Sequence, residues 1–197
     1  LEAGANAGAN ILCLCETNGG CLPIEVFDIT KKVCEHFSGM TIGIHTHNDT
    51  DCATANSLAA VRAGARHVQG TINGMGERCG NANLCVLAPN LALKLGYDVL
   101  DSEKLKTLTE VSRSIFEIAN ITPIMNMPYV GESAFAHKGG LHIDALRKNK
   151  KTYEHISPEL VGNERRFLIS EISGSSTVLG KLEKAKITED KELATRI

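Results

Sequence analysis

The stretch MTIGIHTHND, residues 40–49, is a short apolar run that ends in a cluster of polar side chains. In a β-strand, side chains two positions apart point to the same face of the sheet. His45 and His47 therefore project together, as two ligands of one ion should. The stretch predicts a buried strand with chemistry at its end, and it leaves open which third ligand the two histidines find.

Two further runs resemble this strand, ILCLC at residues 11–15 and HVQGTI at residues 67–72. Each is short, apolar and bounded by Gly, Asn or Asp, which is typical of buried parallel strands. Helical patterns separate them, one following Pro23, a favoured first helical residue, and one over residues 53–65. Repeated strand–helix units predict an α/β fold, either a barrel or a doubly wound sheet.

The pattern changes after about residue 96. Residues 101–120 begin with the capping candidates Asp101 and Ser102 and carry one apolar stripe, so they predict one amphipathic helix. Residues 121–135 contain two prolines and little periodicity, which indicates an extended linker.

A compact second unit is expected after the linker. It should contain one more helix and then a strand over the alternating run RRFLISEISG, residues 165–174. The charged last segment, 181–197, is expected to be helical or frayed. The chain has no initiator Met and opens like the tail of a helix, so we expect a fragment cut at both ends.

Composition narrows the classes of function. The formal net charge is −2, and aromatic residues make up 4% with no Trp, so nucleic acid and anionic membranes are not expected partners. No run approaches the roughly 18 apolar residues of a transmembrane helix. Seven cysteines without a C-x-x-C pair or a secretory signal predict reduced thiols and a cytoplasmic protein, and they argue against a structural zinc site.

The histidine pair has two interpretations. It is either a strand with one buried and one exposed histidine, or a metal site. The metal interpretation gains support because the pair ends a strand, where α/β barrels carry their chemistry. Asn48 and Asp49 follow and can hold the imidazoles or cap the next helix.

A second polar loop, NGMGERCGN at residues 73–81, follows the next predicted strand. A dinucleotide-binding loop is the rival interpretation, but the third glycine is misplaced and no strand presents an acidic residue to a ribose about twenty residues on. Glu77 and Arg78 also fit a pyrophosphate poorly. A loop that offers Glu77, Arg78 and Asn81 near two histidines is more typical of a metal and substrate site.

Two further stretches contain candidate residues. Thr17, in CETNGG at residues 15–20, lies on the same predicted rim as the histidines, and its hydroxyl can bind a carboxylate. The alternative is a plain turn. The stretch AFAHKGGLHIDAL, residues 134–146, could bind an anion or supply an acid or base, or it could be a polar loop before a helix.

Together these stretches resemble the citramalate, 2-isopropylmalate and homocitrate synthase family of metal-dependent TIM-barrel enzymes. The resemblance covers nearly the whole chain, and residues 153–174 are most similar to the citramalate branch. It implies the C-terminal part of a TIM (β/α)8 barrel followed by a small α+β subdomain. Strands six to eight would occupy residues 1–96, a helix and linker 97–130, and the subdomain 131–197.

Enzymes of this family condense acetyl-CoA, as cosubstrate, with a 2-keto acid on a divalent ion. The resemblance implies pyruvate as the keto acid and citramalate as the product, in the biosynthesis of isoleucine and leucine. By motif, His45, His47 and Asn81 would be metal ligands, with Mg²⁺, Mn²⁺ or Zn²⁺ as the ion. The family's fourth protein ligand is an Asp on the first strand, which this chain does not contain.

The resemblance also assigns substrate and catalytic residues. Thr17 would hold the carboxylate of the keto acid, and Glu77 would lie near the reacting groups. His142 would match a histidine that a partner subunit inserts as an acid or base, which implies a homodimer whose subdomain reaches the partner's barrel. The base that deprotonates the acetyl group is not identified.

Other functions stay open. A 2-isopropylmalate or homocitrate synthase would differ in its keto acid, and the same scaffold can serve a hydroxyacyl-CoA lyase. Lyases of this kind end without the subdomain, which argues against that choice. A non-catalytic metal-binding or interaction fragment is the third hypothesis. Because three strands cannot close an eight-stranded barrel, we expect the 197-residue chain alone to be inactive.

Overall fold

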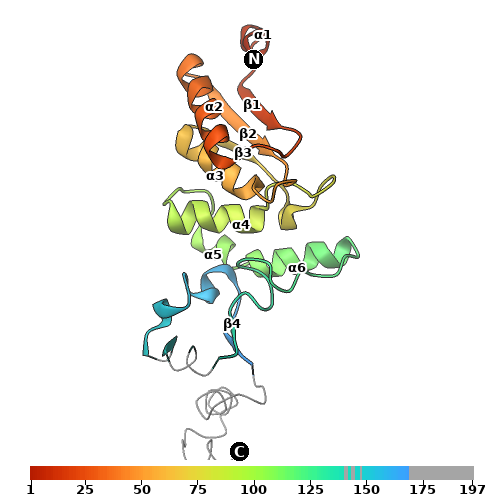
Figure 1. Ribbon diagram of the computed structural model, residues 1–197, viewed down its shortest axis with the longest axis vertical. Helices are drawn as coiled ribbons and strands as arrows, with labels where there is room; N and C mark the ends of the chain where they lie inside the picture. Colours follow the sequence, from red (N-terminus) through yellow and green to blue (C-terminus); the bar gives the residue numbers. More distant parts are fainter. Residues whose placement is uncertain (140–141, 143–144, 147, 169–197) are drawn as a thin grey trace, which may run out of the picture. The chain divides into compact units, whose positions relative to one another are not determined.

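The computed structural model describes residues 1–139, 142, 145–146 and 148–168. The chain divides into two compact units, Leu1–Leu100 and Asp101–Ile197. The first unit is a mixed α/β structure, which confirms the α/β part of the predicted fold class (Figure 1). Its elements are α1 (Glu2–Asn6), β1 (Ile11–Glu16), α2 (Pro23–His36), β2 (Thr41–Thr46), α3 (Ala53–Ala63), β3 (His67–Gln69), η1 (Ile72–Gly74), α4 (Leu84–Pro89) and η2 (Asn90–Lys94).

The three strands form a parallel sheet in the order β1-β2-β3. His45 on β2 is paired with Cys15 on β1 and with Gln69 on β3. The third strand is shorter than the predicted run 67–72, because the chain turns away at Gly70. A side chain there would come within 2.5 Å of the carbonyl oxygen of Ala82, so only glycine allows this approach.

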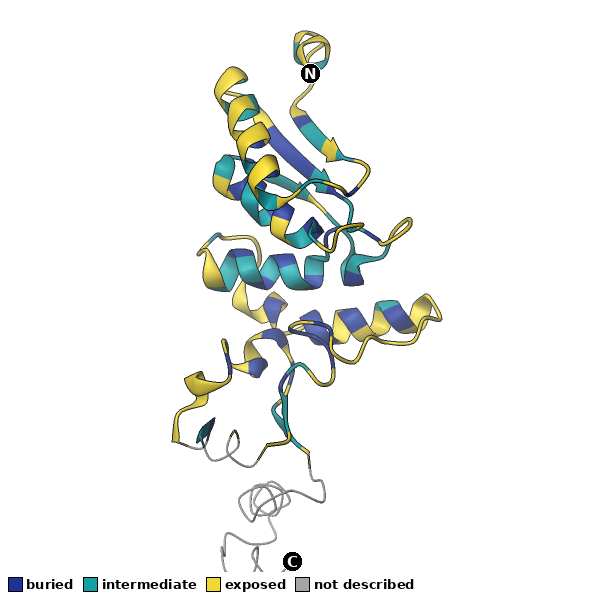
Figure 2. Cartoon of the chain, viewed as in Figure 1, coloured by how far each residue is buried: buried dark blue, intermediate teal, exposed yellow. Residues whose placement is uncertain are grey.

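The two faces of the sheet differ in chemistry. Ile44 packs into an apolar core with Val26 of α2 and Ala60 of α3, so both helices cover the same face (Figure 1). Figure 2 shows that β2 is the most buried of the strands, in agreement with its position at the centre of the sheet. Because side chains alternate along a strand, Cys13, Cys15 and His45 point to the opposite face.

The second unit contains short elements joined by long loops. They are α5 (Ser102–Leu105), α6 (Leu108–Ile118), β4 (Ala136–His137), η3 (Lys150–Thr152), η4 (Pro158–Val161) and β5 (Arg166–Phe167). β4 and β5 pair in parallel. The stretch 121–135 contains no helix or strand, and Met127, Tyr129, Val130 and Phe135 within it are buried.

The prediction of one continuous helix over residues 101–120 is wrong. Asp101 does cap α5, accepting from the backbone N–H of Lys104 at 2.8 Å. The helix is interrupted after Leu105, where the hydroxyl of Thr107 donates to the carbonyl of Lys104 at 2.9 Å. A threonine hydroxyl bound to a nearby carbonyl competes with the helical hydrogen-bond ladder and favours such a break.

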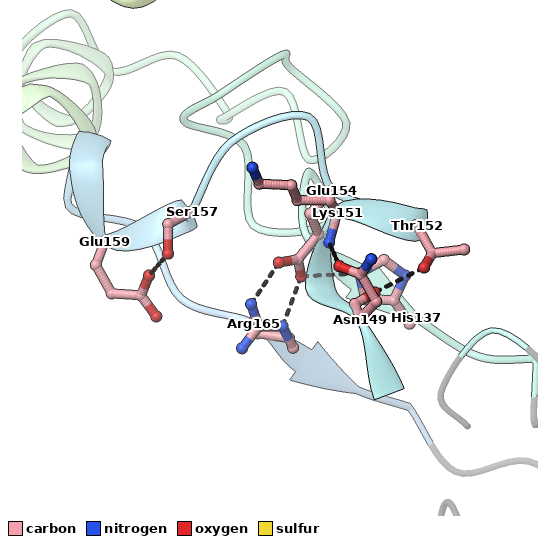
Figure 3. Close-up of polar contacts among 8 residues, drawn as sticks. All are labelled: His137, Asn149, Lys151, Thr152, Glu154, Ser157, Glu159 and Arg165. Carbon is pink, nitrogen blue, oxygen red and sulfur yellow. Dashed lines mark hydrogen bonds and ion pairs between the residues drawn. The ribbon is translucent and has the colours of Figure 1, made fainter. Parts of the chain in front are cut away.

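A buried ion-pair network connects the segments of the second unit. Glu154 is 6% exposed, and its carboxylate accepts from Nε of Arg165 at 2.6 Å and lies 3.2 Å from Nε2 of His137 (Figure 3). His137 ends β4 and Arg165 precedes β5, so Glu154 joins the two strands at one edge. A buried carboxylate is tolerated here because both of its oxygens meet charged or polar donors.

Some predicted elements fall beyond what can be described. Of the strand predicted over 165–174, the structure shows β5, which ends at Phe167. Residues 169–174 and the segment 181–197 lie outside the described residues. Within the part of the chain that the structure describes, no helix has the length and apolar character needed to span a bilayer.

Candidate metal and substrate site

Three loops meet where the strands of the first unit end. They are residues 17–22 after β1, 47–52 after β2 and 70–83 after β3. The backbone N–H of Asn48 donates to Gly80 at 2.9 Å, and that of Ala82 donates to Thr46 at 3.1 Å. The second and third loops are therefore fixed to one another by main-chain hydrogen bonds, which places the predicted histidine pair beside the predicted glycine-rich loop.

A chain of hydrogen bonds orients His45. Its Nδ1 lies 3.0 Å from Oε1 of Gln69, and Nε2 of Gln69 lies 3.2 Å from Nε2 of His67. An amide oxygen can only accept, so Nδ1 of His45 must carry the proton and donate. In a neutral imidazole with its proton on Nδ1, the Nε2 atom carries a lone pair, as in a metal-binding imidazole that is held by an acceptor behind it.

His47 and Asn81 are neighbours across the two loops, forming an isolated antiparallel bridge. The ring of His47 is 5.2 Å from that of His45, centroid to centroid, at an interplanar angle of 61°. Nδ1 of His47 and Oδ1 of Asn81 are shielded from solvent and have no hydrogen-bond partner among the described residues. Buried polar atoms rarely stay unpaired, so two of them on bridged residues indicate that a ligand belongs there.

The orientation of Asn81 agrees with this interpretation. Its Nδ2 donates to the carbonyl of Met75 at 3.2 Å, which fixes the amide and leaves its oxygen available. Across the described ranges, no three His, Cys, Asp or Glu side chains are grouped to hold an ion by themselves. The two imidazoles and the amide oxygen of Asn81 together are donors of the kind that a divalent ion takes.

Arg78 forms contacts that the sequence did not predict. Its Nε and Nη2 donate to the two carboxylate oxygens of Asp49 at 2.8 and 3.0 Å, and Nη2 also donates to the carbonyl of Thr17 at 2.8 Å. The guanidinium holds the pKa of the Asp49 carboxyl below its usual range, mainly through these hydrogen bonds. Asp49 therefore does not hold an imidazole, whereas Asn48 accepts from the first N–H of α3, Ala53, at 3.1 Å.

The remaining candidate residues lie on the surface. Thr17 and Glu77 are exposed in the loops around the histidine pair, and the hydroxyl of Thr17 donates to the carbonyl of Cys15 at 3.3 Å. His142 belongs to the second unit, where its ring stacks on Tyr153 with centroids 4.1 Å apart and an interplanar angle of 23°. Tyr153 was not singled out in the sequence, because nothing in its local pattern marks it.

Comparison with known families identifies the chain. Residues 1–115 match the family described as HMGL-like, and the chain belongs to it. Residues 129–197 match a second family, described as homocitrate synthase post-HMGL domain-like. These matches confirm the resemblance that the motifs predicted.

Curated relatives match nearly the whole chain. The (R)-citramalate synthases of Aquifex aeolicus and Synechocystis are 58% and 54% identical over 96% and 98% of this chain, which is 36% of each relative. The 2-isopropylmalate synthase of Sulfolobus acidocaldarius is 38% identical over 96% of this chain and 49% of that protein. The chain thus spans about a third of the length of the citramalate synthases it matches.

A solved structure supports the fold. An HMG-CoA lyase from Acenitobacter baumannii, in complex with coenzyme A and 3-methylmalate, superposes with a TM-score of 0.53 and 26% identity. The match covers 64% of this chain and 42% of the lyase chain.

Proposed function

We propose that the whole protein is an acyltransferase that condenses acetyl-CoA with pyruvate to give citramalate, in the biosynthesis of branched-chain amino acids. The observation that carries the proposal is the pair of unpartnered atoms, Nδ1 of His47 and Oδ1 of Asn81, beside the oriented ring of His45. High identity to (R)-citramalate synthases over almost the whole chain supports the choice of substrates.

The fold proposal follows from the same comparisons. Strands β1 to β3 would be strands six to eight of a TIM barrel within residues 1–96, followed by a helix and linker over 97–130 and a subdomain over 131–197. A parallel sheet with helices on one face and polar loops after the ends of its strands supports a barrel segment. The homodimer, in which the subdomain reaches the partner's barrel, belongs to this proposal.

His45, His47 and Asn81 would hold the ion, and Mg²⁺, Mn²⁺ or Zn²⁺ bound there would polarise the keto group of the substrate as a Lewis acid. The hydroxyl of Thr17 would exchange its bond to the carbonyl of Cys15 for one to the substrate carboxylate, which would turn the keto group toward the histidine pair. Gln69 keeps the ring of His45 in the tautomer that leaves Nε2 unprotonated. His142 donates or accepts the proton at the reacting oxygen, with Glu77 nearby.

The compartment and the ligands are consistent with this function. All seven cysteines are free thiols, as expected for a cytoplasmic enzyme. The lyase structure was solved with coenzyme A and 3-methylmalate, an isomer of citramalate, so a related fold accommodates both kinds of molecule.

A second candidate is 2-isopropylmalate synthase, which the relative in Sulfolobus acidocaldarius supports at lower identity. The two functions differ in the keto acid, since 2-ketoisovalerate is bulkier than pyruvate. The match of residues 129–197 to a domain found after the HMGL-like region of homocitrate synthases favours a synthase over a lyase.

The test is a keto-acid panel on the purified whole protein. Release of free CoA is followed by a thiol reagent with acetyl-CoA and pyruvate, 2-ketoisovalerate or 2-ketoglutarate, before and after treatment with a chelator. We expect the highest kcat/KM with pyruvate, loss of turnover on chelation and recovery when a divalent ion is returned. A preference for 2-ketoisovalerate would favour the second candidate, and no CoA release with any keto acid would contradict both.

A further inference from the structure

Arg78 contacts all three loops of the candidate site. It belongs to the loop that carries Asn81, its guanidinium grips the carboxylate of Asp49 two residues after His47, and it reaches the carbonyl of Thr17. The bidentate contact fixes both the distance between the guanidinium and the carboxylate and the plane of the guanidinium. A single hydrogen bond does not fix both. Thr50 also joins these loops, through its hydroxyl and its backbone N–H to the carbonyl of Gly19, and the N–H of His47 donates to Glu16. Arg78 adds the side-chain link that reaches the carbonyl of Thr17 itself.

The backbone around this contact is built to bring the loops together. Arg78 has a φ of 56°, in the left-handed region that side-chain-bearing residues seldom adopt. Gly19, with a φ of 68°, lies so close to Asp49 that a Cβ would come within 2.2 Å of the carboxylate. Strained or glycine-dependent backbone persists where the surrounding contacts require it. In this site, the backbone at Arg78 and Gly19 allows Asp49 to lie between Arg78 and the loop after β1.

The guanidinium is already committed to protein groups. Nε and Nη2 are taken by Asp49 and by the carbonyl of Thr17, and the charge of Arg78 is balanced by the carboxylate it contacts. A substrate carboxylate that used Nε or Nη2 would have to displace Asp49 or the carbonyl of Thr17, which leaves only Nη1 for a direct contact. The contacts therefore favour a structural link to Thr17 over direct binding of the substrate by this arginine.

We propose that Arg78 is a positioning residue that sets Thr17 for the carboxylate of the keto acid. The inference rests on the proposed function, because it assumes that Thr17 binds that carboxylate. In a 2-keto acid the carboxylate and the keto carbon are joined by one bond, so the two subsites must keep a fixed separation. Sites that hold reacting groups tolerate displacements of only about 0.5 Å, and Arg78 supplies the connection that keeps the separation.

The informative variant is Arg78→Lys in the whole protein. Lysine keeps the charge but has no planar fork, so it cannot hold both oxygens of Asp49 and the carbonyl of Thr17 together. We expect the KM for pyruvate to rise about tenfold, as for the loss of one well-placed polar contact, while the KM for acetyl-CoA changes less than about twofold. Asp49→Asn, which removes the same ion pair from the other side, should give the same pattern.

A double-mutant cycle separates positioning from general loop stability. If Arg78 acts through Thr17, then Arg78→Lys should raise the KM for pyruvate in the wild-type background and have no further effect in the Thr17→Ala background. Arg66→Lys is the matched control, because Arg66 also donates to main-chain carbonyls, at 3.2 Å to Val61 and 2.8 Å to Ala65, outside the site. It should leave both KM values unchanged.

Two outcomes would overturn the inference while leaving the proposed function intact. One is an unchanged KM for pyruvate in both Arg78→Lys and Asp49→Asn. The other is that Arg78→Lys raises the KM for pyruvate equally in the wild-type and Thr17→Ala backgrounds and raises the KM for acetyl-CoA by the same factor. This result would indicate a role in loop stability alone. Absence of CoA release by the wild-type protein would overturn the proposed function and this inference with it. Pyruvate-dependent thermal stabilisation of each variant provides a measure of binding that does not require turnover.

Discussion

His45 and His47 show what a short motif encodes and what it omits. Their spacing alone predicts a shared face, and the rings do lie 5.2 Å apart. The amide that holds His45 comes from Gln69, on a different strand, and no local signal connects the two positions. Asn81 was identified through a motif, whereas the direction of its side chain depends on the carbonyl of Met75, which only the folded loop places there.

Cys13 provides a prediction at the scale of one residue. Burial raises the pKa of its thiol to about 11, and the neighbouring Cys15 adds to the shift, so the neutral thiol is favoured until strongly alkaline pH. An ordinary exposed thiol has a pKa near 8.5, so at pH 8 Cys13 should contain on the order of a hundredfold less thiolate. We expect iodoacetamide to label Cys13 much more slowly than the exposed Cys15 and Cys79.

The measurement is mass spectrometry of peptides from the native protein, sampled over time at pH 8 and pH 9.5. The labelling rate of Cys13 should rise about tenfold per pH unit between these two values, because both lie below the pKa of its thiol. Labelling in urea is the control, since unfolding should make the cysteines equivalent. Equal native rates for Cys13 and Cys79 at pH 8 would show that the thiol is not buried as described.

At the scale of elements, the loops after the strands decide the site. The strands and helices of the first unit follow from apolar patterning, but the loop 70–83 depends on approaches that local propensity does not describe. Gly80 is an example: with a φ of 90°, a Cβ on it would come within 2.0 Å of the carbonyl oxygen of Gly74. The close packing of Gly80 against Gly74 allows Asn81 to turn back toward His47.

Gly80→Ala tests this packing, and Gly8→Ala is its matched control. Gly8 has nearly the same φ, 87°, but has nothing within 4 Å of the position of a Cβ. Both substitutions incur the cost of a left-handed alanine, about 1–2 kcal/mol, and only Gly80→Ala adds a clash with backbone. Urea denaturation should show a clearly larger loss of stability for Gly80→Ala, and equal losses would mean that the loop adjusts without cost.

The second unit was less predictable than the first, for a physical reason. Its segments are joined by side chains from separate parts of the sequence, such as Glu154 with His137 and Arg165, and local patterning does not predict such contacts. The amphipathic stripe over residues 101–120 indicated a helix correctly but could not show that Thr107 would interrupt it. The apolar pattern of a sequence indicates which face of a helix is buried. Where the helix is interrupted depends on individual hydrogen bonds.

In the whole protein, the proposed role of His142 involves two chains. The chain spans 36% of the length of the citramalate synthases it matches, so the barrel and the dimer proposed above concern the whole protein. If His142 acts in the partner's site, then a dimer of one His142→Ala chain and one His45→Ala chain contains one complete site. Random mixing makes half of the dimers mixed, so activity should recover to roughly a quarter of the wild-type value.

Co-expression of the two variants with different affinity tags allows the mixed dimers to be isolated. Each variant alone should be nearly inactive. Mixed dimers without activity would indicate that His142 acts within its own chain or has no role in turnover.

The central claim is that His45, His47 and Asn81 bind one divalent ion, and a calorimetric titration of the metal-free whole protein with Mn²⁺ tests it most directly. The account predicts one ion per chain, affinity weakened at least about tenfold in His47→Ala and Asn81→Ala, and unchanged affinity in Arg66→Lys. Wild-type affinity in both His47→Ala and Asn81→Ala would contradict it.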